Sequence, residues 1–305
     1  MFSVISQQRT TMKNSCLVLE GGGLRGAFTS GVLEYFLERN LNFGRVIGVS
    51  AGACIGASFL SKQRGRNRKV NVEYPSDGRY MGIRHLLMTG SYFNMAFVFG
   101  ELPRQLVPFD EQSFFLNPAE FEVVATSLET GSSVIFSKSE MVEIGIDKVL
   151  IASSSIPLLS RPENIQGRLY LDGGVADPLP VKYALQKHER AVVVLTRPRD
   201  YRKGKLENRL LLKLVFRKYP RFLSTLLARN EAYNVTLDFC AQMEREGRLL
   251  LLAPSPEYSI GRTEKRLERR LRLYHHGYQL AGELFEEIKL FLDGTVAHPL
   301  TDYLK

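Results

Sequence analysis

Cysteine is scarce in this chain of 305 residues, and its spacing argues against two common uses of the residue. Cys16, Cys54 and Cys240 are odd in number and lie far apart, with no CxxC pair among them. A disulfide framework needs pairs, and a structural zinc site needs closely spaced ligands. The sequence therefore supports neither, and it favours a reducing compartment.

Long apolar runs are also missing. No uncharged apolar stretch approaches the roughly 20 residues that span a bilayer, and residues 1–15 lack a basic start followed by an apolar segment. We therefore expect a cytoplasmic protein, with peripheral attachment to the inner face of a membrane as an option. Apolar residues still make up 44% of the chain, enough for a large buried core.

Positive charge is concentrated in one part of the sequence. Residues 197–229, called the basic segment below, contain eleven Lys or Arg and two acidic residues, so they account for the whole net charge of +9. Leucines and aromatics alternate with these charges, as they do in an interfacial helix. Three interpretations stay open: a solvated helical face, an anionic membrane surface, and nucleic acid. Because no nucleic-acid-binding module is recognisable, we expect no nucleic-acid partner.

Short apolar strands alternate with helical patterns from residue 16 onward. CLVLE (16–20), a glycine-rich turn and a helix over 27–39 form one unit, and a strand ending before Ser50 with a helix over 51–62 forms the next. Two consecutive units of this kind predict neighbouring parallel strands in an α/β fold. Further strands are predicted within 121–129, 132–137, 168–174, 191–195 and 248–254. From Leu267 to Leu292 the apolar spacing predicts one long helix or two helices broken near Gly277.

Ser50 lies at the junction of a predicted strand and a predicted helix, in Gly48-Val49-Ser50-Ala51-Gly52. This GxSxG spacing is typical of a catalytic serine at a sharp corner, where Gly48 and Gly52 remove β-carbons that would collide. The start of the following helix favours developing negative charge. The alternative is that Ser50 only caps the helix.

A glycine-rich loop precedes the first predicted helix and has two interpretations. Gly21, Gly22, Gly23, Leu24, Arg25 and Gly26 fit the dinucleotide-binding pattern GxGxxG. That pattern expects an acidic residue at the end of the second strand, where this chain has Ser50. Beside a catalytic serine, the same loop would supply backbone N–H donors to a developing oxyanion.

A base for Ser50 is more plausibly a carboxylate than an imidazole. Asp172, in LYLDGG, ends a predicted strand, so we expect it at the same sheet edge as Ser50, with Gly173 and Gly174 letting the chain turn away. The alternative for DGG is an ordinary turn. We assign all five histidines to surface or packing positions: His85, His188, His275, His276 and His298.

The segments between Ser50 and Asp172 allow further interpretations. Aromatic residues are dense in 91–103 and 109–118, where they could line a channel for an apolar chain, form a mobile flap or pack in the core. Ser153, Ser154 and Ser155 precede Pro157 and are expected to shape a turn. Cys54 is expected to be a small packing residue.

Together, GGGLRG at 21–26, GVSAG at 48–52 and DGG at 172–174 resemble, in that order, the motifs of the patatin-like phospholipase family. ASSSIPLL at 152–159 is similar to a further block of that family, and LYHHGYQLAGELF resembles the helical extension of some bacterial members. The resemblance implies a three-layer α/β/α sandwich with a largely parallel or mixed central sheet and a helical C-terminal extension. It also implies lipid acyl hydrolysis by a Ser–Asp dyad through an acyl-enzyme, without metal or cofactor.

Carried over to this sequence, the resemblance makes Ser50 the nucleophile and Asp172 the general base. Amides around Gly22, Gly23 and Leu24 would form the oxyanion hole, and Arg25 would fix the loop or meet a phosphate. The chain is then divided into a flexible tail (1–13), a patatin-like catalytic domain (14–200) and a basic, mainly helical extension (201–305) with one added strand near 248–253. Two other functions stay open, a nucleotide-binding oxidoreductase and a non-catalytic membrane-binding module.

Overall fold

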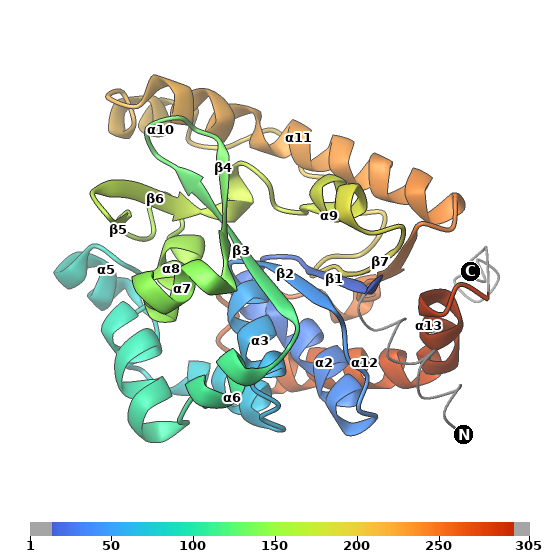
Figure 1. The fold of residues 1–305 in the computed structure, drawn as a ribbon. Helices are drawn as coiled ribbons and strands as arrows, with labels where there is room; N and C mark the ends of the chain where they lie inside the picture. Colours follow the sequence, from blue (N-terminus) through green and yellow to red (C-terminus); the bar gives the residue numbers. More distant parts are fainter. Residues whose placement is uncertain (1–13, 296–305) are drawn as a thin grey trace.

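A mixed β-sheet forms the middle layer of the computed structural model, which describes residues 14–295 (Figure 1). Its order is β5-β6-β3-β2-β1-β7-β8, with β4 paired to β3. Neighbours from β3 to β8 in this order are parallel, whereas β4 and β6 are antiparallel to β3, and β5 is antiparallel to β6. The strands are β1 (Cys16–Leu19), β2 (Arg45–Val49), β3 (Glu120–Ser127), β4 (Ser133–Ser137), β5 (Glu163–Ile165), β6 (Arg168–Asp172), β7 (Ala191–Val194) and β8 (Leu249–Leu252).

Helices cover both faces of the sheet, because the central strands are apolar on both sides. Leu17 and Leu19 pack toward the helices drawn below the sheet in Figure 1, whereas Cys16 and Val18 pack toward those drawn above it. The lower layer includes α2 (Ala27–Glu38), α3 (Ala51–Leu60), α12 (Leu267–Glu283) and α13 (Phe285–Leu292). The upper layer includes α9 (Val181–Lys187) and α11 (Pro220–Arg245). This arrangement confirms the predicted three-layer α/β/α sandwich.

The remaining helices are short, with at most ten residues each. Those preceding β3 are α4 (Arg66–Arg68), α5 (Ile83–Thr89), a π-helical segment (Phe97–Leu106) and α6 (Glu111–Leu116). Those following it are α7 (Lys138–Ile144), α8 (Ile146–Ser154) and α10 (Arg209–Val215). No helix within residues 14–295 combines the length and the hydrophobicity needed to cross a membrane.

The C-terminal helices correct one prediction. The chain breaks at Leu284, between α12 and α13, and not at Gly277, which lies buried within α12. A β-carbon at Gly277 would lie 2.2 Å from the carbonyl oxygen of Phe28 in α2. The glycine therefore permits close contact between two helices, and the prediction of a break near it is wrong.

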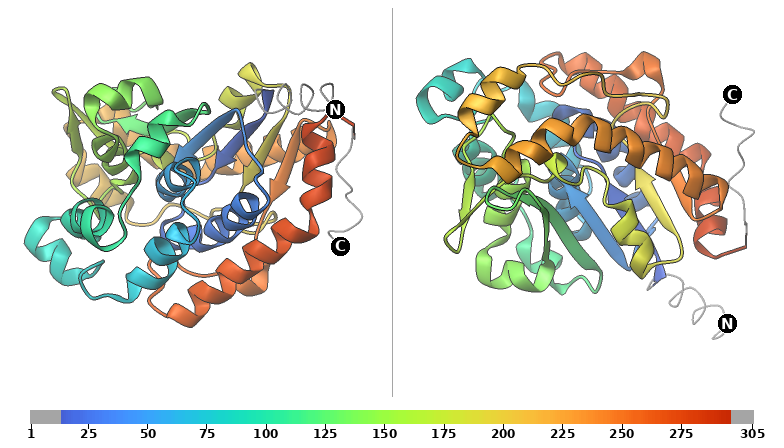
Figure 2. Two further views of the ribbon diagram at one scale, coloured as in Figure 1. Left: turned by 60° about the horizontal axis from the view of Figure 1, so that its bottom comes forward. Right: turned by 90° about the horizontal axis from the view of Figure 1, so that it is seen from above.

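Residues beyond 200 build the same layers as the residues before them. β8 pairs with β7 at the edge of the sheet, and α11 runs across the upper face (Figure 2, right). The division of the chain at residue 200 stays a prediction. The predicted tail over 1–13 lies outside the described residues, as does the end of the extension from 296 onward.

Strands β2 and β6 meet head-on along one edge of β3. Val49, the last residue of β2, pairs with Val124, and Asp172, the last residue of β6, pairs with Ala125. β4 pairs with residues 122–126 of β3, and these residues also pair with β2 or with β6. Because a strand has only two edges, β4 occupies the edge of β3 opposite to the one that β2 and β6 share. Because β2 is parallel and β6 antiparallel to β3, their carboxyl ends point at each other. The residues that end or follow these strands are thus brought together.

Candidate active site

Ser50 occupies a strained corner between β2 and α3. Its φ of 54° and ψ of −125° are unusual for a residue with a side chain, and such strain is concentrated at functional sites. Added β-carbons would lie 2.5 Å from the Cα of Ala53 at Gly48, and 2.4 Å from the carbonyl oxygen of Leu19 at Gly52. The corner therefore requires both glycines. Ser50 makes no side-chain cap to α3, so the interpretation as a helix cap is wrong.

The hydroxyl of Ser50 instead donates a hydrogen bond to Asp172. Ser50 Oγ lies 2.7 Å from Asp172 Oδ2, and both residues are buried. Asp172 Oδ1 accepts the N–H of Gly174 at 2.7 Å, so the DGG segment forms a turn and also holds the carboxylate. Burial raises the pKa of Asp172, against the lowering effects of these two hydrogen bonds and of Arg229 and Arg262. The arrangement is that of a hydroxyl paired with a carboxylate of increased basicity.

Ser153 fixes the backbone of the corner, a role that the sequence did not reveal. Its Oγ accepts the N–H of Ser50 at 2.8 Å and donates to the carbonyl oxygen of Val124 at 2.6 Å. Ser153 and Ser154 are the last residues of α8, so the expectation of a simple turn there is wrong. The similarity of ASSSIPLL to a family block was the only available signal.

The glycine loop lies directly beside Ser50. A β-carbon at Gly21 would be 2.9 Å from the Cβ of Ser50. The N–H of Leu24 donates to the carbonyl oxygen of Arg262 at 2.9 Å, and the N–H of Arg25 to that of Gly22 at 3.3 Å. Among residues 14–295, no acceptor is bonded to the amides of Gly22 or Gly23. Like the amide of Gly21, these two amides are free donors within the described residues, whereas that of Leu24 is already used.

Two pockets of opposite character meet at Ser50. The first, called the apolar pocket, has a volume of about 140 Å³, and the second, called the basic pocket, has a volume of about 610 Å³. Gly23, Ser50 and Ile156 line both of them. Apolar and aromatic side chains lining the apolar pocket include Phe93, Met95, Val98, Phe99, Pro103, Phe109 and Leu150. Cys54 also lines it and contacts the hydroxyl of Ser154. Cations lining the basic pocket are Arg25, Arg197, Lys203, Lys205, Arg229 and Arg262.

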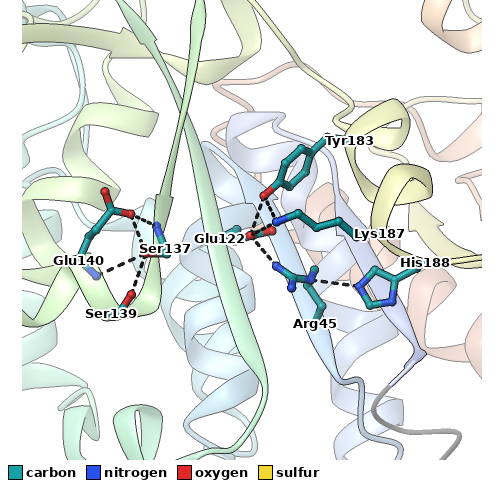
Figure 3. A network of polar contacts seen from close by, with 8 residues as sticks. All are labelled: Arg45, Glu122, Ser137, Ser139, Glu140, Tyr183, Lys187 and His188. Atoms are coloured by element: carbon teal, nitrogen blue, oxygen red, sulfur yellow. Dashed lines mark hydrogen bonds and ion pairs between the residues drawn. The ribbon is translucent and has the colours of Figure 1, made fainter.

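No histidine of the described chain lines either pocket. His188 contacts Arg45, the first residue of β2, which also pairs with Glu122 (Figure 3). Ser50 follows the other end of β2, roughly 16 Å along the strand. His276 stacks on Tyr258, with ring centroids 4.2 Å apart. Within residues 14–295, no histidine is bonded to Ser50 or Asp172; His298 falls outside this range.

This chain is similar to several known proteins over part of its length. YjjU of Escherichia coli, an uncharacterised protein, is 28% identical over 191 residues, which are 59% of this chain and 50% of YjjU. An uncharacterised NTE family protein of Mycobacterium tuberculosis is 29% identical over 169 residues, 54% of this chain and 44% of that protein. The chain thus spans about half the length of these curated relatives. Among solved structures, VipD from Legionella pneumophila matches with a TM-score of 0.48 and 14% identity, over 90% of this chain and 67% of VipD.

Two family models match separate parts of the sequence. A domain of unknown function (DUF6363) matches residues 219–293, which include all of α11, all of β8 and the final two described helices. The model described as patatin-like phospholipase matches residues 17–185, more than half of the chain, and covers Ser50, Asp172 and most of the layered sheet. The chain therefore belongs to the patatin-like phospholipase family.

Proposed function

We propose that this protein is a serine lipid acyl hydrolase that uses Ser50 and Asp172 as a catalytic dyad. The observation that carries the proposal is the 2.7 Å hydrogen bond from Ser50 Oγ to Asp172 Oδ2, at the junction of an apolar and a basic pocket. A strained, glycine-flanked serine next to a buried base is the arrangement that nucleophilic ester cleavage needs.

The proposed reaction has two halves. Asp172 takes the proton of Ser50 as Oγ bonds to the ester carbonyl carbon, and the free amides of Gly22 and Gly23 stabilise the resulting oxyanion. The bond to the alcohol oxygen then breaks, and that oxygen takes the proton from Asp172. Water attacks the acyl-enzyme with Asp172 again as base, which releases the fatty acid and restores Ser50. The raised pKa of Asp172 supports this role, since a stronger base removes a hydroxyl proton more readily.

The two pockets suggest how a lipid ester is oriented. An acyl chain fits the apolar pocket, whose wall includes Phe93, Phe99 and Phe109. The alcohol portion then points toward the basic pocket. Of the interpretations offered for the aromatic segments, we adopt the acyl-chain channel as part of this proposal.

The exposed part of the basic segment is proposed to dock the enzyme on an anionic membrane. Helix α10 turns Leu210, Leu211, Leu214 and Val215 to solvent beside exposed Lys213, whereas Leu212 is buried and lines the basic pocket. Apolar side chains between cations are suited to a surface of anionic lipid. Because α10 forms a wall of the basic pocket, docking there would bring the pocket close to the lipid.

Labelling with a fluorophosphonate tests the proposed nucleophile, and a panel of phospholipids, lysophospholipids, glycerides and short p-nitrophenyl esters tests the reaction. We expect labelling on Ser50, no labelling of Ser50→Ala, and hydrolysis of at least one ester of the panel. A folded protein that is neither labelled nor active, and that binds NAD, would support the oxidoreductase alternative. Vesicle binding without labelling or hydrolysis would support the non-catalytic module.

A further inference from the structure

Three arginines of the basic pocket carry buried donors without acceptors. The Nε atoms of Arg25, Arg197 and Arg229 are buried and have no hydrogen-bond partner among the described residues. Arg25 is only 8% exposed, and all three side chains line the basic pocket. A buried donor without an acceptor is costly, so folded proteins usually provide it with one. Three such donors around one cavity indicate that a ligand supplies the acceptors.

The charges of the pocket are equally unbalanced. Within residues 14–295, the side chains of Arg25, Arg197, Lys203, Arg229 and Arg262 form no ion pair with a carboxylate. Glu20, Asp172 and Glu207 also line the cavity, and Glu20 accepts hydrogen bonds from the backbone and hydroxyl of Thr196 and from the hydroxyl of Tyr233. Since six cations line the cavity with these three acids, it keeps an excess of positive charge.

Burial and the neighbouring cations act together on Lys203. Burial, reinforced by the charge of Arg229, lowers the pKa of Lys203 to about 7. The ammonium group lies over the ring of Tyr233 at 3.7 Å, and the guanidinium of Arg197 lies over that of Tyr201 at 4.0 Å. Aromatic faces hold both cations in place without neutralising them. An anion in the cavity would relieve this repulsion.

The cations come from separate parts of the chain. Arg25 belongs to the glycine loop, Arg197 and Lys203 follow β7, Arg229 lies on α11, and Arg262 precedes α12. The backbone around Lys203 is fixed by Asn234, which accepts its N–H at 2.8 Å and donates to its carbonyl oxygen at 3.0 Å. Since the same cavity is lined by Ser50 and Asp172, its ligand lies next to the proposed reacting atoms.

We propose that the basic pocket binds the phosphate of a phosphomonoester head group, so that the preferred substrate is an acyl ester carrying a terminal phosphate. This rests on the proposed function and names its substrate class. A phosphomonoester brings a charge of about −1.5 to −2 at neutral pH and three strong acceptor oxygens, which suits several unpaired cations. A phosphocholine head group brings one negative charge and a cation that these residues repel.

The first test compares kcat/KM for oleoylglycerol phosphate with that for oleoylglycerophosphocholine, two substrates with the same acyl chain. We expect the wild-type protein to prefer the phosphomonoester at least tenfold, and Arg197→Gln and Lys203→Gln each to lower this ratio severalfold or more. Arg229 is avoided because its charge also lowers the pKa of Asp172. Arg202→Gln is the matched control, since Arg202 is exposed and pairs with Asp238 at 2.8 Å.

A second test measures binding without catalysis, by calorimetry on full-length Ser50→Ala. We expect oleoylglycerol phosphate to bind at least tenfold more tightly than the phosphocholine analogue, and Lys203→Gln to remove most of the difference, with Lys203→Arg restoring it. Glycerol phosphate or inorganic phosphate binding as tightly as oleoylglycerol phosphate would assign the pocket to a free phosphate and overturn the substrate proposal.

The two proposals fail in different ways. Ester hydrolysis that depends on Ser50 but shows no preference between the two head groups would overturn the head-group proposal and leave the hydrolase intact. If the wild-type protein hydrolyses no ester but Ser50→Ala still binds oleoylglycerol phosphate selectively, the hydrolase proposal is overturned and the phosphate site stands. Equal loss on both substrates in Arg197→Gln and Lys203→Gln would also count against the head-group proposal.

Discussion

The side chain of Ser153 connects the backbone of Ser50 to the central sheet. Its hydroxyl accepts the N–H of Ser50 and donates to the carbonyl oxygen of Val124, the residue that pairs with the last position of β2. Ser50 adopts a positive φ, which is unfavourable unless the surroundings fix it. Ser153 thus provides one of the contacts that keep the proposed nucleophile in its strained conformation.

Replacing Ser153 by alanine should therefore reduce catalysis through misplacement of Ser50. We expect kcat to fall roughly tenfold or more with little change in KM, because small displacements of a nucleophile are costly. Ser155→Ala is the matched control. Ser155 directly follows α8, its hydroxyl bonds within the described residues only to Ile151 of that helix, and its backbone carbonyl still accepts the N–H of Asp172. A similar loss in both variants would indicate a general disturbance of α8.

Removal of either member of the dyad should abolish ester hydrolysis. We expect Ser50→Ala and Asp172→Asn each to lose on the order of 10³-fold or more in kcat, with the double variant no worse than either, because the two side chains act as a unit. Circular dichroism would confirm folding. By contrast, alanine at His85, His188, His275 or His276 should leave activity in place. A folded but inactive histidine variant would contradict the dyad.

Asp172 should lower the stability of the protein at neutral pH. Burial raises the pKa of the Asp172 carboxyl group in the folded protein above its ordinary value of 3.8. The protonated carboxyl group therefore stabilises the fold fully below pH 3.8, and this stabilisation is lost as the pH rises through the raised pKa. We expect Asp172→Asn to unfold at a higher temperature than the wild type near pH 7, with the difference shrinking toward about pH 4. Thermal unfolding across this range measures it. A wild type that is the more stable at pH 7 would contradict the burial effect.

The proposed oxyanion donors can be tested at Gly23. This residue has a φ of +57°, and a β-carbon there would lie 2.7 Å from the carbonyl oxygen of Arg262. We expect Gly23→Ala to displace the free amides and reduce kcat on the order of a hundredfold. Gly261→Ala serves as control, because no atom lies within 4 Å of the added carbon and its φ is ordinary. Binding of NAD that is lost in Gly23→Ala would favour the dinucleotide interpretation.

Charge reversal next to α10 should affect membrane-bound substrate selectively. Each basic residue near an anionic surface contributes about 1 kcal/mol, an effect that salt weakens. We expect Lys213→Glu with Arg217→Glu to lower the ratio of vesicle-lipid hydrolysis to short-chain ester hydrolysis tenfold or more at low salt. Arg245→Glu, an exposed site farther along the chain on α11, is the control. An unchanged ratio would make this part of the basic segment an ordinary solvated surface.

The proximity of Ser50 and Asp172 was predictable, but the geometry behind it was not. The sequence indicates that Ser50 follows a strand and that Asp172 ends one. The expectation that they share a sheet edge assumed that the two strands run in the same direction. In the structure, β6 is antiparallel to β3 and meets β2 end to end. Strand direction depends on the path of the chain between strands, which local residue patterns do not record.

Packing between distant segments explains the other differences between the predictions and the structure. Gly277 has the pattern of a helix breaker, yet its neighbour is Phe28, almost 250 positions earlier. In the same way, a count of charges over 197–229 cannot separate Arg197, Lys203 and Arg229, which line the basic pocket, from exposed Lys213 and Arg217. The short strand β5 was missed because three residues carry too little pattern. These features depend on contacts between segments far apart in the sequence.

The two pockets that meet at Ser50 also affect which molecule accepts the acyl group once the alcohol has left in the proposed reaction. In the proposed acyl-enzyme, the fatty chain still fills the apolar pocket, whereas the departed head group leaves the basic pocket open beside Ser50. Water enters through that opening, and so does any second alcohol that can reach the acyl group. A competing acceptor must pass the same cations as the original head group, so a phosphorylated alcohol has an advantage over a neutral one. The cavity that selects the donor would in this way also select the recipient of a transferred acyl chain.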